Sequence, residues 1–162
     1  MVGDRGYFVI LRNVSLKVLK MGTIKNFEEL EIWKLARELV NQIYADFNRC
    51  NDFTFKRQIT GAGISVMNNI SEGFCRSGDN EFKNFLNIAV GSSGEVKCMY
   101  YIAEDQKYVK CEIATDRRSK CQRIINGANK LMSYLRSSQT TKPQDHKTTR
   151  PQDHKTIRPL DH

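Results

Sequence analysis

The stretch that decides the fold is residues 81–103, which read EFKNFLNIAVGSSGEVKCMYYIA. Apolar or small residues recur in it at alternating steps of three and four, which is the spacing of one face of an α-helix. The pattern holds over three heptads and predicts a helix that is buried along one seam. The seam positions are Phe82, Phe85, Ala89, Ser92, Val96, Met99 and Ala103.

The same periodicity predicts three more helices, and residues 1–142 contain no Pro to interrupt them. Asn26 is the predicted N-cap of the first helix, and Gly73 the predicted end of the second. Four amphipathic helices with short connections predict an all-α fold, an antiparallel up-down four-helix bundle. The predicted helices run from about Phe27 to Arg49, Phe53 to Ser71, Asp79 to Ala103 and Ile113 to Leu135.

The first predicted helix has its own apolar stripe. Its members are Phe27, Leu30, Trp33, Ala36, Val40, Ile43 and Phe47. In the second, Gly61 and Gly63 are expected to let a neighbouring backbone come close, although each lowers helix propensity by about 1 kcal/mol relative to Ala.

The two ends of the chain differ from the bundle, which we assign to residues 21–138. Residues 1–20 do not share the pattern of the predicted helices, so we predict an over-extended or disordered N-terminus and a natural start at Met21. Residues 139–162 contain a Pro-punctuated octapeptide repeat and are predicted to be a disordered tail. The repeat carries His every eight residues, but we assign it no metal.

The distribution of His and Cys excludes several kinds of chemistry. All three His lie in residues 146–162, so the bundle cannot use Ser–His or Cys–His catalysis or His-ligated zinc. The five Cys show neither a metal-binding spacing nor a disulfide framework. Cys98 and Cys121 are expected to be buried thiols. Because the sequence shows no transmembrane stretch, we predict a cytoplasmic protein without membrane contact. Because His is missing from the bundle and the Cys spacing fits no metal site, we also predict a non-enzymatic protein without metal, cofactor or small-molecule substrate.

The net charge of +8 is spread unevenly. Residues 1–20 carry +3 and residues 141–162 carry +2, which leaves +3 on residues 21–140. This supports a weak general affinity for polyanions, and it makes RNA or DNA a candidate partner.

Polar side chains on the second and third helices form one candidate site. If the two helices make a hairpin, Asn69 is expected to face Ser92, and Glu72 to reach Arg76 or a backbone donor at the turn. We interpret the set as a structural polar lock that fixes helix register. The alternative is a metal-dependent enzyme that uses Glu72 and Glu95. The members of the predicted lock are Ser65, Asn69, Glu72, Arg76, Ser92 and Glu95.

Basic residues at the start of the fourth helix form a second candidate site for nucleic-acid contact. Asp116 lies among them and is expected to pair with Lys120 at i,i+4, so a solvated face is the alternative. The cluster consists of Arg117, Arg118, Lys120 and Arg123.

Residues 24–135 contain several motifs in the same order as a known protein family. They include Phe27-Glu28-Glu29-Leu30-Glu31-Ile32-Trp33, Asn69-Ile70-Ser71-Glu72-Gly73 and Ile88-Ala89-Val90-Gly91-Ser92. With them the chain resembles the 23S ribosomal RNA intervening-sequence proteins, which are related to the accessory variability determinant proteins of retroelements. The resemblance implies a four-helix bundle that assembles as a ring-like homopentamer, with no known catalytic activity.

Taken together, these observations predict a non-enzymatic helical bundle. We expect it to act as an oligomeric scaffold or as a weak nucleic-acid-binding accessory. A module that docks on another protein is the remaining alternative, and it would require an exposed apolar patch larger than a few hundred Å².

Overall fold

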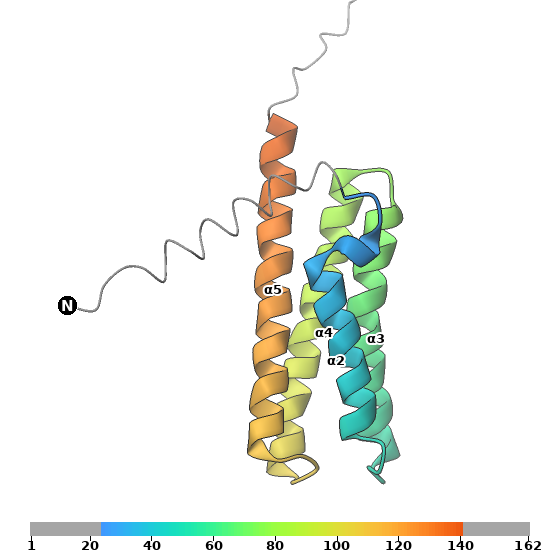
Figure 1. The fold of residues 1–162 in the computed structure, drawn as a ribbon, viewed down its shortest axis with the longest axis vertical. Coiled ribbons are helices and arrows are strands. Elements are labelled where there is room, and N and C mark those ends of the chain that lie inside the picture. The colour runs from blue at the N-terminus through green and yellow to red at the C-terminus, as the bar shows by residue number, and fades with distance from the viewer. Residues whose placement is uncertain (1–23, 141–162) are drawn as a thin grey trace, which may run out of the picture.

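The computed structural model describes residues 24–140, which form a four-helix bundle (Figure 1). The described part of the chain contains no β-strand. The elements are the 3₁₀ turn η2 (Phe27–Glu29) and the helices α2 (Glu31–Asp46), α3 (Phe53–Cys75), α4 (Asp79–Asp105) and α5 (Cys111–Thr140).

Successive helices run in opposite directions, as the colour gradient of Figure 1 shows. α4 packs extensively against both α3 and α5, while the shorter α2 closes the bundle between α3 and α5. The predicted all-α fold is therefore confirmed. The predicted N-terminal segment (1–20) and all but the first two residues of the predicted tail (139–162) lie outside the described residues.

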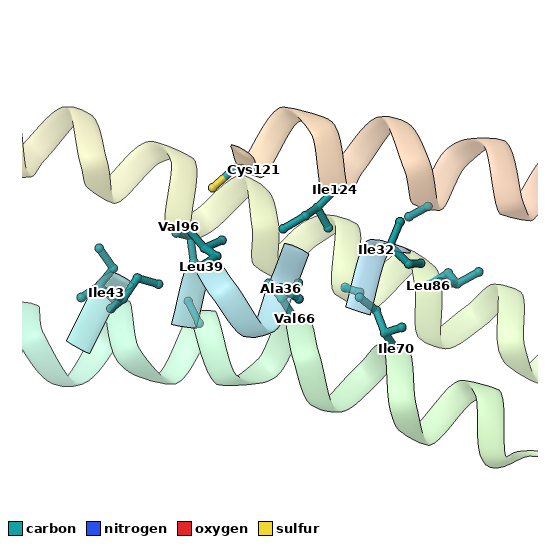
Figure 2. Packing of buried hydrophobic residues seen from close by; sticks show 14 of the residues in the cluster. Ile32, Ala36, Leu39, Ile43, Val66, Ile70, Leu86, Val96, Cys121 and Ile124 are labelled. Carbon is teal, nitrogen blue, oxygen red and sulfur yellow. The ribbon is translucent and has the colours of Figure 1, made fainter. Parts of the chain in front are cut away.

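The core runs along the bundle axis and receives side chains from all four long helices. Figure 2 shows Leu39, Val66, Val96 and Ile124 converging from α2, α3, α4 and α5. Each of the four is at most 1% exposed. Burying one such side chain stabilises the fold by about 1.5–3 kcal/mol, so this seam is the main source of stability.

The predicted bounds of the first helix are wrong at both ends. Leu30 has an extended backbone with ψ 123°, which separates η2 from α2 and buries its side chain. The break lets Phe27 pack edge-on against Trp33 at 5.1 Å between ring centroids. Asn26 makes no side-chain cap, and its amide donates to Glu29 Oε1 instead at 3.5 Å. At the other end, α2 stops at Asp46 rather than Arg49.

The predicted apolar stripes are shifted slightly around the helices. On α2, Ile32 and Leu39 are buried, whereas Trp33 and Val40 are only half-buried. On α4 the core takes Leu86, Ser93 and Tyr100, while Phe85 and Ser92 lie half-buried at the edge. Each helix contacts more than one neighbour, so its buried face is broader than a two-position seam. The buried Ser93 hydroxyl donates to Ala89 O at 2.8 Å and is satisfied within its own helix.

Gly73 does not end α3, which continues to Cys75. A Cβ at Gly73 would lie 2.6 Å from Cβ of Phe85, so the glycine serves the close approach of α3 and α4. A Cβ at Gly63 would lie 2.7 Å from Cδ1 of Ile43, the tip of an α2 side chain. The atom near Gly63 is thus a side-chain atom rather than the expected neighbouring backbone, and a Cβ at Gly61 would meet nothing within 4 Å.

Among the cysteines, Cys121 is fully buried as expected, but Cys98 is exposed. Cys98 lies on the solvent side of α4, one residue before the buried Met99. α5 is longer than predicted at both ends, and it begins at Cys111 rather than Ile113. No helix within residues 24–140 combines the length and apolar character needed to span a bilayer.

Candidate functional site

Among the six residues predicted to form a polar lock, one hydrogen bond joins α3 to α4, and it is not the expected one. The hydroxyls of Ser65 and Ser92 lie 2.8 Å apart and bridge the two helices. Asn69 does not face Ser92. Its amide nitrogen turns back within α3 and donates to the Ser65 carbonyl at 2.7 Å and to Ser65 Oγ at 3.0 Å. Asn69 therefore orients Ser65, and Ser65 makes the contact between helices.

The two carboxylates of the lock are held separately. Arg76 donates to Glu72 at 2.8 Å within α3, as predicted, and both side chains are half-exposed. Glu95 on α4 instead accepts a hydrogen bond from Gln58 at 3.4 Å. Residue 72 lies seven positions beyond Ser65, and residue 95 three positions beyond Ser92 in the opposite direction. At 1.5 Å per residue, Glu72 and Glu95 are about 15 Å apart along the bundle.

That separation removes the basis for the alternative enzyme, because two carboxylates must converge to share a metal or a proton. No cluster of three or more His, Cys, Asp or Glu side chains able to hold a metal occurs in the part of the chain that the structure describes. The geometry leaves Glu72 and Glu95 as surface carboxylates with polar partners.

The predicted basic cluster is largely neutralised within the molecule. Arg117 donates to both carboxylate oxygens of Asp46, at 2.8 and 3.0 Å, and to Asp116 at 2.5 Å. Burial lowers the pKa of Arg117, but the hydrogen bonds to Asp46 and Asp116 outweigh it, so the pKa is raised and the guanidinium stays charged. The Arg117 charge is thus neutralised by carboxylates within the bundle.

Arg118 and Lys120 also have partners on other helices. Arg118 pairs with Glu104 and lies over the ring of Tyr101, 4.1 Å from its centroid. Lys120 bonds Glu38 at 2.5 Å and the Gln42 side-chain oxygen at 2.8 Å, and its side chain is only 7% exposed. The predicted pair of Asp116 with Lys120 is therefore wrong, because Lys120 turns inward to α2.

Arg123 is the member of the cluster that remains exposed. Its side chain forms no ion pair with any carboxylate within residues 24–140. The cluster thus divides into three cations that join helices and one that faces solvent.

A buried polar centre around Asp46 was missed from the sequence. The Tyr100 hydroxyl, whose side chain is fully buried, donates to Asp46 Oδ2 at 2.8 Å beside the Arg117 guanidinium. Burial and the neighbouring Asp46 carboxylate raise the pKa of Tyr100. Asp46, Tyr100 and Arg117 come from α2, α4 and α5, and their separation in sequence gave no signal of the contact.

The outer side of the α3/α4 pair has an unusual composition. Gly61 lies one turn before Ser65, and Ile88 and Gly91 precede Ser92 on α4. A Cβ at Gly61 or Gly91 would meet nothing within 4 Å, and Ile88 is 51% exposed. We call the surface formed by Gly61, Ser65, Ile88, Gly91 and Ser92 the α3/α4 outer face.

Comparisons with known proteins agree with the fold. A solved structure from Bacteroides thetaiotaomicron, a protein with unknown function from the S23 ribosomal protein family, is 21% identical with a TM-score of 0.59. The match covers 62% of this chain and 97% of that chain, and at this identity it supports the fold alone. No curated protein matches the chain. The family model described as 23S rRNA-intervening sequence protein matches residues 28–130, so the chain belongs to this family.

Proposed function

We propose that the protein is a non-enzymatic, cytoplasmic scaffold that assembles with copies of itself through the α3/α4 outer face. The ring-like homopentamer that the sequence resemblance implies is the assembly we expect. The observation that carries the proposal is that Gly61 and Gly91, which lie inside long helices and are open, share this face; the third open helix glycine, Gly94, is not part of it.

A glycine inside a helix costs about 1 kcal/mol relative to Ala, unless close packing requires it. Packing within the bundle explains Gly63 and Gly73, whose added Cβ atoms would clash, but it does not explain Gly61 and Gly91. A second copy seated on the outer face would make use of both, because a surface without Cβ atoms lets another backbone approach closely. The exposed Ile88 side chain would be buried in the same contact.

The polar lock supports this proposal by fixing the surface. The Ser65–Ser92 hydrogen bond ties α3 to α4 in the middle of the outer face, and Gln58–Glu95 ties them again nearby. Because the helices are held in register, Gly61 and Gly91 keep a constant relative position. A partner would thus meet a preformed surface.

The experiment is size-exclusion chromatography with light scattering on the full chain and on the double variant Gly61→Arg/Gly91→Arg. We expect the unmodified protein to show about five times the 18.7 kDa chain mass. The variant should be monomeric, because the added side chains occupy the contact surface. Its monomer should also be about 1–2 kcal/mol more stable to urea, since two helix glycines are replaced.

The matched control is Asn41→Arg/Ala45→Arg, which adds the same charge at exposed positions of α2. The control should assemble normally. A monomeric unmodified protein at tens of micromolar, or an unchanged assembly of the glycine variant, would contradict the proposal.

A second proposed role is an accessory contact with nucleic acid. It is supported by α5, which carries no Asp or Glu after Asp116. A mobility-shift assay with RNA and DNA at two salt concentrations tests it, because electrostatic binding weakens steeply with salt. No shift at low salt would leave the scaffold role alone.

A further inference from the structure

The distal part of α5 carries an unusual charge pattern. Between residues 117 and 140 the helix has six Arg or Lys and no acidic residue. Arg117, Arg118 and Lys120 are held by carboxylates of the bundle. The other three, Arg123, Lys130 and Arg136, are exposed. No carboxylate partner of these three appears within residues 24–140.

The three exposed cations are spread along the helix and partly around it. Arg123 and Lys130 are seven residues apart, so they lie on one side about 10 Å from each other, whereas Arg136 lies about 9 Å farther on and is rotated by about 120° around the helix axis. The exposed residues between them, Asn126, Asn129 and Ser133, are uncharged. Arg123, Lys130 and Arg136 are exposed, and Figure 1 shows that the end of α5 extends past the other helices.

We propose that this α5 basic face, formed by Arg123, Lys130 and Arg136, binds the phosphate backbone of a nucleic-acid duplex without reading its bases. The inference rests on the nucleic-acid role proposed above and names both the surface and the class of ligand. The proposed contact lies toward the end of α5 rather than at its start. At the start, three of the four predicted cations pair with carboxylates of other helices.

The composition of the face favours a duplex over a single strand. Single-strand binding depends on exposed aromatic rings that stack on bases. The aromatic residue on this half of α5, Tyr134, is half-buried and packs against the core. The exposed aromatic side chains Tyr44, Phe53, Tyr101 and Tyr108 lie toward the opposite end of the bundle. A duplex offers a dense array of phosphates, with one charge per ~1.7 Å, and requires no stacking.

A membrane surface fits the face less well. An interfacial helix buries large apolar side chains between its cations. Most large apolar residues of this part of α5 are buried in the core instead (Ile124, Leu131, Met132 and Leu135), and Ile125 is half-buried. The face therefore offers charge and hydrogen-bond donors without an apolar anchor.

The experiment measures binding of the full chain to a mixed-sequence duplex, as RNA and as DNA, by fluorescence anisotropy between about 50 and 200 mM salt. Three phosphate contacts predict a slope of log K against log salt of about −2.7 for duplex DNA. The variant Arg123→Glu/Lys130→Glu/Arg136→Glu should bind at least about tenfold more weakly at the lower salt concentration and lose most of this slope. The neutral variant with Gln at the three positions should fall between the two.

The matched control is Arg49→Glu/Arg57→Glu/Lys110→Glu, which changes the net charge equally at exposed positions toward the other end of the bundle. The control should retain the slope. Circular dichroism checks that every variant is folded.

The outcomes separate the two proposals. If the protein binds duplex but the α5 variant binds equally well, or the control loses as much, the α5 basic face is wrong while the nucleic-acid role stands. If the unmodified protein binds no nucleic acid at the lower salt concentration, both fail. Tighter binding to the single strand, or binding only to phosphatidylserine vesicles, also overturns the assignment to a duplex.

Discussion

Asp46 is a nearly buried carboxylate that joins three helices. Its side chain is 7% exposed and accepts hydrogen bonds from Tyr100 and Arg117. A buried ion pair adds little net stability, but removing one partner leaves the other charge uncompensated. The identity of residue 46 should therefore matter far more than that of an exposed carboxylate such as Glu72.

We predict that Asp46→Asn lowers the free energy of unfolding by about 3 kcal/mol, because the Arg117 guanidinium loses the counter-charge at its buried side. Urea denaturation measures the loss. The control Glu72→Gln breaks the half-exposed pair with Arg76 and should cost far less, because exposed ion pairs contribute little to stability. Equal losses in the two variants would show that the Asp46 centre is not a special contact.

The turn between α4 and α5 contains a residue in the left-handed region. Lys107 has φ 58°, which is a conformation that favours glycine. The Tyr108 N–H donates to Ala103 O at 2.8 Å and the Lys107 N–H to Glu104 O at 3.0 Å, which is the Schellman pattern at the end of a helix. The hydrogen bonds thus hold a non-glycine residue in a costly conformation.

Lys107→Gly should stabilise the protein by about 1 kcal/mol, because glycine adopts positive φ without steric cost. The shift of the urea midpoint measures it. At the neighbouring Gln106, where φ is −80°, the same change should be neutral or destabilising. A stabilising Gln106→Gly together with a neutral Lys107→Gly would contradict this account of the turn.

Cys121 is one of two buried groups, with Tyr100, that make the stability of the bundle fall at alkaline pH. Burial raises the pKa of its thiol from 9.0 to about 12. Above pH 9 the unfolded chain loses this proton and the folded chain keeps it, so the free energy of unfolding decreases as pH rises from 9 to about 12. One such group contributes a slope of up to about 1.4 kcal/mol per pH unit.

The variant Cys121→Ala should therefore lose less stability between about pH 8 and pH 11 than the unmodified protein, whatever its stability at the lower pH. Urea midpoints at a series of pH values provide the comparison. Cys98→Ala, at an exposed position, should keep the original pH dependence. If both variants follow the unmodified curve, Cys121 does not control alkaline unfolding.

The assembly and ligand proposals also belong to the whole molecule, because each needs residues that the fold brings together. The α3/α4 outer face combines Gly61 from one helix with Ile88 and Gly91 from the next. The α5 basic face depends on α2 and α4 to take up Arg117, Arg118 and Lys120.

The sequence by itself determined the number of helices, their approximate limits and the all-α fold. It could do so because apolar spacing is a local property that each helix displays independently. It also identified the contacts made within one turn, such as Glu72 with Arg76, whose partners are four residues apart.

Only the tertiary structure decided which polar groups meet. Ser65 rather than Asn69 reaches Ser92, Lys120 turns to Glu38 rather than Asp116, and Glu72 and Glu95 lie far apart. It also decided that Gly73 continues a helix where glycine usually ends one, because Phe85 packs there. Such outcomes depend on the rotation and axial offset of neighbouring helices, which the periodicity of a single helix does not specify.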